Sequence, residues 1–388
     1  MKKKAYFATA EELERLGPEA IPPQMISGKH LIYSSPATLA FNSPGAEGFG
    51  VKRAGLAVPD SIMLIVAPGC CGRNTSLISS MPEYNDRFFY LMMDETDIVT
   101  GRHLKKIPKA VKEICDCCEK KPSVVMICIP CVDALLGTDM ERVCRKAEEK
   151  VDIPVRPCYM YALTREGRKP PMVHVRQSLY SLLEPQKKKG NVVNLLGFFS
   201  PLVDDCELYD LLHQAGVKTI HEISRCKDYE EYQTMSEANF NLVLHPEARF
   251  AAEDFHNRLQ IPFIELRRLY QTDKIASQYQ AFGRVLGVEF SDGAYRKKAE
   301  DAVAKFKEKR PDASFAIGEC MNGDPFEMAL AMIKYGFRVP EIYGTLTAEN
   351  FIYLNQLSKL SPETKVFSNM EPTMLYYDPE KSGVNMTI

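Results

Sequence analysis

The chain has 388 residues, 45% of them hydrophobic, and a formal net charge of −2 with charges of both signs mixed along its length. That length predicts two or three domains of roughly 100 to 200 residues, each with an ample core. The balanced charge excludes a broad attraction to nucleic acid or to an anionic membrane, and no stretch reaches the roughly 18 apolar residues that a membrane span needs.

The chain begins MKKKAYFATAEELERLGPEA, a basic start that soon turns acidic. It lacks the apolar centre of a signal peptide, so we expect a cytoplasmic protein. We expect residues 1–60 to form an extended N-terminal arm that leads into the first domain.

From residue 61, strand-like and helix-like patterns alternate. Apolar runs typical of buried strands are separated by segments with helical spacing, in the order SIMLIVAP (61–68), GRHLKKIPKAVKEICDCCEKK (101–121), PSVVMICIP (122–130), DMERVCRKAEEK (139–150) and IPVRPCYM (153–160). Such alternation predicts a parallel sheet with helices on both faces. We assign the first α/β domain to residues 61–187.

The same alternation restarts after the polar linker EPQKKKGN at 184–191. Four strand-like runs predict a second α/β domain over 188–290: VVNLLGFFSP (192–201), VKTIHEI (217–223), NFNLVLHP (239–246) and IPFIEL (261–266). A third α/β domain is predicted over 291–388. Its pattern is a strand, a helix and a strand, namely SFAIGE (314–319), PFEMALAMIKYG (325–336) and RVPEIYG (338–344). The fold class is therefore α/β, with three Rossmann-like parallel-sheet domains in series and ligand sites beyond the carboxyl ends of the strands.

The chain has twelve cysteines, and two clusters of them follow strands directly. Cys70 and Cys71 end the first strand-like run, and Cys128 and Cys131 lie at the end of the second. In a protein without a secretion signal this usage favours thiolate or metal chemistry over disulfides, and soft sulfur selects iron–sulfur clusters, zinc or copper(I). A redox dithiol and buried thiols at strand ends are the alternatives.

A third group, Cys115, Cys117 and Cys118, falls on the helix that leads into the second strand. Positions i and i+3 of a helix share a face but i+2 does not. We therefore expect ordinary helix residues there, with a metal site as the alternative.

The stretch 96–160 resembles the nitrogenase component 1 family, whose subunits share a glycine-bearing turn, a helix, a strand and the motif Cys-Pro-x-x-Leu-Ile-Gly-Asp-Asp before a further helix. CVDALLGTDME (131–141) is similar to that motif at five positions and departs from it at two: Cys131, Leu135, Leu136, Gly137 and Asp139 agree, while Val132 and Thr138 differ. VAPGCCGR (66–73) resembles the family's Gly-Pro-x-Gly-Cys. Patterns similar to the second and third domains follow in order, so the resemblance extends from about residue 30 to about residue 370. It implies that the three domains surround a central cavity.

The resemblance implies that Cys71 and Cys131 match two of the three cysteines that each nitrogenase subunit gives to a cluster at the subunit interface. The first of the three has no counterpart, because no cysteine precedes Cys70. Two thiolates from this chain and two from a partner, in a homodimer or in a heterodimer with a sister subunit, would supply a [4Fe–4S] cluster. Cys70 and Cys128 are further candidate ligands.

The family's second metal site is not carried over. The position of its cysteine falls near Leu244 or His245, and the last histidine of the chain is His256. Dinitrogen is therefore not the expected substrate. His245 is either a ligand or proton donor in the cavity or a cap before Pro246, and Arg249 is a candidate for binding an anionic substrate group.

His174 lies in the basic segment 162–185, which we expect to be a long loop. The loop is either solvated or close to the substrate, and it also carries Arg165, Arg168, Lys169 and Arg176. We include His174 among the candidate catalytic residues.

The resemblance implies a reductase component that receives low-potential electrons from a separate ATP-dependent iron protein and reduces a small molecule. The chain has no phosphate-binding loop of its own, which fits that division of labour. The alternative is a scaffold on which a metallocofactor is built and passed on, as by the family's assembly proteins. A chain that has lost its ligands and only stabilises a partner is the third possibility.

Overall fold

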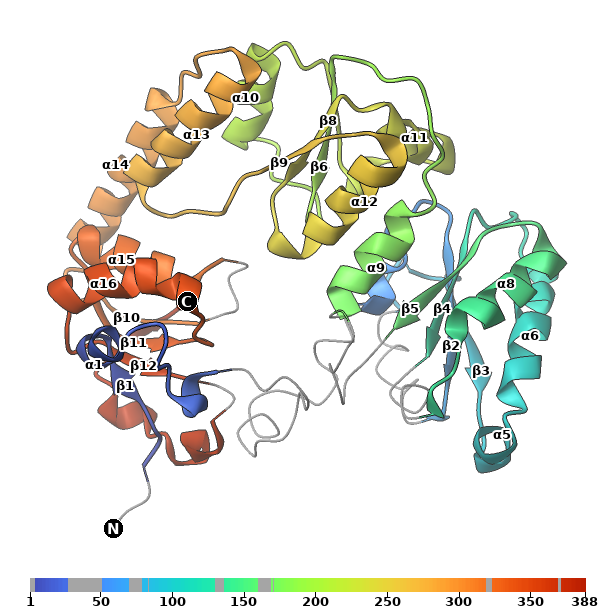
Figure 1. The fold of residues 1–388 in the computed structure, drawn as a ribbon, viewed down its shortest axis with the longest axis horizontal. Coiled ribbons are helices and arrows are strands. Elements are labelled where there is room, and N and C mark those ends of the chain that lie inside the picture. The colour runs from blue at the N-terminus through green and yellow to red at the C-terminus, as the bar shows by residue number, and fades with distance from the viewer. Residues whose placement is uncertain are drawn as a thin grey trace. The chain divides into compact units, whose positions relative to one another are not determined.

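The computed structural model describes residues 4–26, 51–69, 79–82, 84–129, 136–159, 169, 171–318, 323–368 and 371–388. Cys70, Cys71 and Cys131 lie outside these residues. The chain forms two compact units, whose elements are labelled in Figure 1. The central unit comprises Gly45–Val203 and Val217–Glu265, and the terminal unit comprises Met1–Pro44, Asp204–Gly216 and Leu266–Ile388.

The first sheet of the central unit has four parallel strands in the order β3-β2-β4-β5. The strands are β2 (Ile62–Ala67), β3 (Phe88–Met92), β4 (Val125–Ile129) and β5 (Val155–Tyr159). In the middle strands β2 and β4 every residue is buried, because helices cover both faces of the sheet there. Along the edge strand β3 only Phe88 is buried, and partly buried and exposed residues alternate after it.

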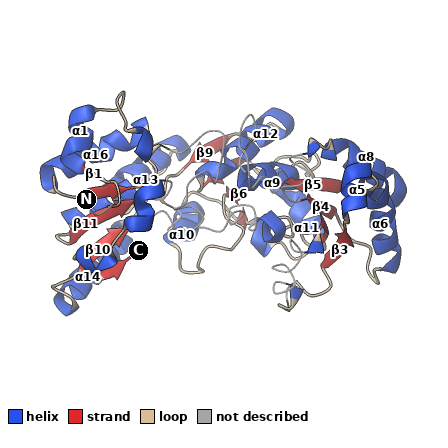
Figure 2. Cartoon of the chain, turned by 90° about the horizontal axis from the view of Figure 1, so that it is seen from below, coloured by secondary structure: helices blue, strands red, loops and turns tan. Residues whose placement is uncertain are grey.

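Four helices accompany this sheet: α5 (Glu95–Thr100), α6 (His103–Cys117), α8 (Met140–Val151) and α9 (Pro171–Tyr180). Ile107 of α6 and Val143 of α8 pack with Leu64 on one face, and Figure 2 shows both helices on the same side of β4. Val175 of α9 packs with Met126 on the opposite face. Burial of each such side chain contributes roughly 1.5–3 kcal/mol.

The second sheet of the central unit is also parallel, in the order β7-β6-β8-β9. Its strands are β6 (Val192–Leu196), β7 (Thr219–His221), β8 (Phe240–Val243) and β9 (Phe263–Glu265), with helices α11 (Tyr229–Gln233) and α12 (Arg249–Leu259). Phe255 of α12 packs against Tyr180 of α9, with ring centroids 5.1 Å apart. The two sheets of this unit therefore share one hydrophobic core.

The terminal unit contains a five-stranded sheet in the order β1-β12-β11-β10-β13. Its strands are β1 (Ala8–Thr9), β10 (Ser314–Ile317), β11 (Arg338–Tyr343), β12 (Lys365–Phe367) and β13 (Met386–Thr387). Its helices are α1 (Ala10–Leu16), α10 (Glu207–Gln214), α13 (Thr272–Leu286), α14 (Gly293–Lys309), α15 (Pro325–Lys334) and α16 (Phe351–Leu360). Strand β1 is antiparallel to β12, while the other pairs are parallel.

The predicted α/β class is confirmed, and every strand pair of the first sheet is parallel. The prediction of a long loop at 162–185 is wrong for its second half. Residues 171–180 form α9, because Pro171 occupies the first helical position, where a missing N–H costs no hydrogen bond. The domain boundaries at 187 and 290 stay predictions. Within the described ranges, no helix is both long and apolar enough to cross a membrane.

Candidate functional site

The carboxyl edge of the first sheet is where the two cysteine-bearing segments begin. Strands β2 and β4 are direct neighbours, with Ile62 opposite Val125 and Ile65 opposite Cys128. Adjacent strands lie about 4.8 Å apart, so the segments that follow Ala67 and Ile129 start at neighbouring points of one edge. The strand order also reverses between β2 and β4, which is the usual place for a ligand in an open α/β sheet.

The turn before Cys70 is anchored on the neighbouring strand. The backbone N–H of Met93 donates to the carbonyl of Ala67 at 3.1 Å. A Cβ atom at Gly69 would lie 3.0 Å from Cε of Met92, so a larger residue at Gly69 would force this side chain to shift. The described part of the cysteine segment thus packs against the end of β3.

Cys128 lies within the core that the two sheets share. It is fully buried and pairs in register with Cys158 of β5. Burial raises the pKa of the Cys158 thiol well above its usual value, and the nearby Cys128 adds to that shift. Iron binds a thiolate, which an apolar environment disfavours. The described geometry therefore favours the buried-thiol alternative for Cys128, and its role as a ligand stays a prediction.

The cysteines at the end of α6 are spread over different degrees of exposure. Cys117 is exposed, while Cys115 and Cys118 are partly buried. Burial raises the pKa of Cys115 and of Cys118. Among the residues that the structure describes, no group of three or more His, Cys, Asp or Glu side chains is arranged to hold a metal ion.

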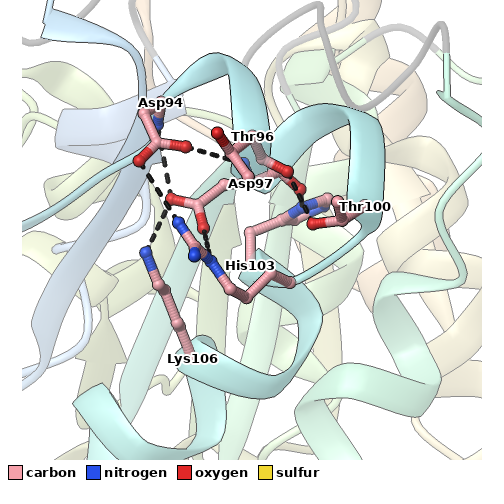
Figure 3. Close-up of polar contacts among 7 residues, drawn as sticks. Asp94, Thr96, Asp97, Thr100, His103 and Lys106 are labelled. Carbon is pink, nitrogen blue, oxygen red and sulfur yellow. Dashed lines mark hydrogen bonds and ion pairs between the residues drawn. The ribbon is translucent and has the colours of Figure 1, made fainter.

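A buried carboxylate, Asp97, organises the turn that follows β3 (Figure 3). Asp94 is the N-cap of α5 and its side chain accepts from the N–H of Asp97 at 2.7 Å, while the Asp97 carboxylate accepts from the N–H of Asp94 at 3.3 Å. This reciprocal pair satisfies two donors at the start of α5. The ring nitrogen Nδ1 of the buried His103 lies 2.9 Å from the carbonyl oxygen of Asp97.

Two cations neutralise Asp97. Nε of Arg102 donates to Oδ1 and Nζ of Lys106 donates to Oδ2, each at 2.7 Å. The side chain of Asp97 is only 1% exposed, whereas those of Arg102 and Lys106 are 49% and 37% exposed. The bonds from Lys106 and then Arg102 hold the pKa of Asp97 well below its usual value. The network fixes α5, the turn at Gly101 and α6 beside the carboxyl edge.

Asp97 is not among the candidate functional residues that the sequence pattern predicts. The available signal was its place three residues after the helix-capping Asp94, followed by basic residues five and nine positions later. That spacing is typical of a capping box at the start of one helix and of ion pairs to the next.

His174 lies near the carboxyl edge of the first sheet. It projects from α9 against Tyr159, the last residue of β5, with ring centroids 4.4 Å apart in an edge-to-face arrangement. Its Nδ1 is 3.3 Å from Oγ of Ser178. Burial, and next the nearby Lys169, lower the pKa of His174 to about 4. The imidazole is therefore neutral at pH 7.

His245 lies at the carboxyl edge of the second sheet, just after β8. The N–H of Glu247 donates to its Nδ1 at 3.3 Å, so the imidazole caps the short helix η4 (Pro246–Ala248). Its ring also packs edge to face with Phe198 at 5.7 Å. The capping role that the sequence left open is present, and a role in proton donation stays a prediction.

Arg176 ties this edge to α9. Its Nη1 donates to Oε2 of Glu247 at 2.7 Å, and its Nε and Nη2 donate to the carbonyl of Gly197 at 3.1 and 2.6 Å. The guanidinium also lies over the ring of Phe199, 4.6 Å from its centroid. Arg176 is therefore not a solvated loop residue, and its guanidinium is engaged within the protein, since its side chain is only 5% exposed.

Gly197 allows the two middle strands of the second sheet to end close together. Its φ is +143°, and a Cβ atom there would lie 2.8 Å from the backbone nitrogen of His245. Such a contact is too short for any larger residue. Gly197, His245, Glu247 and Arg176 thus form a closed network at this edge.

Arg249 stands apart from that network. Its side chain is 60% exposed, and its Nε lies 3.3 Å from carboxylate oxygens of both Glu253 and Glu265. Of the three predicted catalytic residues, His174 lies at the edge of the first sheet, and His245 and Arg249 lie at the edge of the second.

Comparison with known proteins gives a consistent family. A sequence profile described as nitrogenase component 1 type oxidoreductase matches residues 47–375. The chain is similar to three proteins named nitrogenase iron-molybdenum cofactor biosynthesis protein NifE. The protein of Nostoc sp. is 26% identical over 216 residues, which cover 54% of this chain and 44% of that protein. The protein of Rhizobium meliloti is 27% identical over 224 residues, covering 56% of this chain and 47% of that protein. The protein of Klebsiella pneumoniae is 26% identical over 289 residues, covering 68% of this chain and 61% of that protein.

The chain spans about half the length of these curated relatives. Among solved structures, "Nitrogenase Cp1 at pH 6.5" superimposes with a TM-score of 0.64 at 16% identity, covering 87% of this chain and 79% of that one. "Nitrogenase Cp1 at pH 5" gives a TM-score of 0.60 at 18% identity, with coverages of 98% and 84%. At this level of identity the likeness concerns the fold alone.

Proposed function

Because the chain belongs to the nitrogenase component 1 type oxidoreductase family, we propose that it is an iron–sulfur scaffold on which a metallocofactor is assembled and then passed on. The observation that carries this proposal is the similarity to several proteins named for cofactor biosynthesis, which extends over 54–68% of the chain. The missing counterparts of the family's cavity cysteine and C-terminal histidine also support assembly and release over permanent retention of a cofactor.

Cys71 and Cys131 would hold the cluster, with Cys70 as a further candidate. The arrangement of the described residues fits this, since the two segments start from the adjacent strands β2 and β4 at the point where the strand order reverses. Their donor chemistry fits as well, because cysteine thiolates are the ligands of [4Fe–4S] clusters. A bound cluster supplies iron, sulfide and storage for one electron. Two thiolates from a second subunit complete the set of four, so we expect a homodimer or a heterodimer in the cytoplasm.

The reductase component is the second candidate. The observation that favours it is the pair of imidazoles at the edges of the two sheets, of which His174 is held neutral at pH 7 by burial. In that case an ATP-dependent iron protein delivers electrons to the cluster and a small molecule is reduced nearby. No phosphate-binding loop is present in the sequence, so ATP hydrolysis would belong to the partner.

An anaerobic transfer experiment separates the two functions. The purified full-length chain is loaded with iron and sulfide and then mixed with an iron protein, MgATP and a reductant, while cluster absorbance and electron consumption are followed. A scaffold loses its cluster stoichiometrically to an added apo-acceptor and consumes few electrons. A reductase keeps its cluster and consumes electrons over many cycles, and that result would replace the scaffold proposal.

A further inference from the structure

The central unit contains a pocket at the edge of the first sheet opposite the cysteine segments. Its lining includes Asp60 and Arg87, which precede β2 and β3, and Ser200 and Ser224, which follow β6 and β7. Its volume is about 680 Å³, within the range of roughly 300–1,000 Å³ that small-molecule sites occupy. The pocket therefore joins the amino edge of one sheet to the carboxyl edge of the other.

Arg87 brings a partly buried positive charge to this pocket. Its Nε donates to the carbonyl of Ser61 at 2.9 Å, and its Nη2 donates to the carbonyl of Leu56 at 2.8 Å and to Oγ of Ser61 at 3.0 Å. These acceptors are neutral, and no described residue forms an ion pair with Arg87. Burial lowers the pKa of Arg87, while the nearby Tyr84 and Asp60 act in the opposite direction. Its Nη1 has no protein acceptor within the described part of the chain.

The remaining charges of the pocket favour an anion. Arg53 and Lys227 also line it, both are exposed, and neither forms an ion pair with a described residue. The one carboxylate of the lining, Asp60, is paired with Nζ of Lys120 at 2.7 Å. Apolar walls come from Tyr84, Phe199 and Ile223.

We propose that this pocket binds a small organic oxyanion, a carboxylate or phosphate, attached to an aromatic or aliphatic group. The guanidinium groups of Arg87 and Arg53 bind the oxygens, and Phe199 and Tyr84 pack against the apolar part. Planar guanidinium donors suit both kinds of oxyanion, so the chemistry shared by carboxylate and phosphate is what the pocket recognises. The inference uses neither the cysteines nor the proposed scaffold function.

Calorimetric titration of the full-length chain tests the proposal. The probes are phenyl phosphate and benzoate, with inorganic phosphate as the anion that lacks an apolar group and benzamide as the neutral analogue of benzoate. We expect saturable binding of at least one aromatic anion, binding of inorganic phosphate at least tenfold weaker, and none of benzamide. Absence of binding by both aromatic anions, or equal binding of benzamide, overturns the proposal.

Variants then locate the site. The double variant Arg53→Gln/Lys227→Gln should weaken binding of the aromatic anion at least tenfold, and Arg87→Lys should do so while preserving the charge. The matched control is Lys146→Gln on the exposed side of α8, which should bind like the parent chain. Thermal midpoints measured in parallel establish that each variant is folded. Folded pocket variants that bind as tightly as the control would show that the anion binds elsewhere.

Discussion

The two sheets of the central unit have the same strand arrangement but differently built carboxyl edges. In each, the two middle strands are parallel neighbours and the strand order reverses between them. At the first edge, β2 and β4 continue into segments that carry cysteines, and the nearest described polar network is centred on Asp97, beyond the edge strand β3. At the second edge, β6 and β8 lead into Gly197 and His245, which touch each other.

The two sheets thus have the same topology, which places a candidate ligand site after their middle strands. The residues that follow those strands determine which chemistry each site can support. At the second edge, the buried Arg176 donates hydrogen bonds to Gly197 and Glu247, so these polar groups are bonded to one another. The first edge continues into segments that carry cysteines, which are soft donors. We therefore propose metal chemistry at the first edge and a mainly structural role for the second.

The largest expected effect is on iron at the first edge. Replacing Cys71 or Cys131 by alanine should reduce bound iron from about four atoms per dimer to nearly none, because a four-iron cluster needs four thiolates. Iron content and the visible spectrum of anaerobic preparations measure this. The control is Cys117→Ala, an exposed cysteine of α6, which should retain its iron. Equal iron in all three variants would refute the assignment of these two ligands.

At the second edge, Arg176→Met should destabilise the central unit by about 1–3 kcal/mol, because it leaves the carbonyl of Gly197 and the partly exposed Glu247 without their partner. Denaturant unfolding provides the free energy. Arg249→Met is the matched control. It should lower the free energy of unfolding by less than about 1 kcal/mol, because Arg249 is largely exposed. Similar losses for both variants would contradict the contrast between a closed network and a surface residue.

The pH dependence of stability should identify His174. Its pKa is lowered to about 4 from an ordinary value near 6.5, so the unfolded state binds the proton more readily between these pH values. The contribution of His174 to the free energy of unfolding is fully present above pH 6.5. It decreases as the pH falls towards 4, by at most roughly 3 kcal/mol. His174→Gln should remove that part of the pH dependence, whereas His256→Gln should not. An unchanged pH profile in His174→Gln would exclude a buried neutral imidazole.

The smallest expected effect is that of Asp97→Asn. The amide keeps the reciprocal cap with Asp94 in part but loses the charge that pairs with Arg102 and Lys106, so the thermal midpoint at pH 7 should fall by a few degrees. Because the pKa of Asp97 is lowered, its contribution is present above the ordinary pKa of the group and disappears as the pH falls below it. The difference between parent and variant should therefore vanish in acid, and a constant difference would contradict the ion pairs.

Several elements were predictable from local pattern alone. The middle strands are continuous apolar runs, and helices α6 and α8 show apolar residues at helical spacing, so sequence located both. The positions of Cys71 and Cys131 after two such strands also followed directly. Burial on both faces leaves such a strong signal because almost every side chain must then be apolar.

Other features depended on contacts between distant residues. β3 was not predicted, because its five residues form an edge strand that pairs only with β2. Strand β1 pairs with β12 across more than 350 residues, and α10 packs in the terminal unit although it lies between two strands of the central unit in sequence. No local pattern encodes such partners.

The sequence by itself determined the parallel α/β class and the placement of cysteines at two strand ends, because strand burial and chain order are local properties. Tertiary structure alone decided that Arg176 is a buried partner of Glu247 and that Asp97 holds two cations. The same residue types occur on solvated surfaces, and their chemistry depends on which distant groups the fold brings within about 3 Å and removes from water.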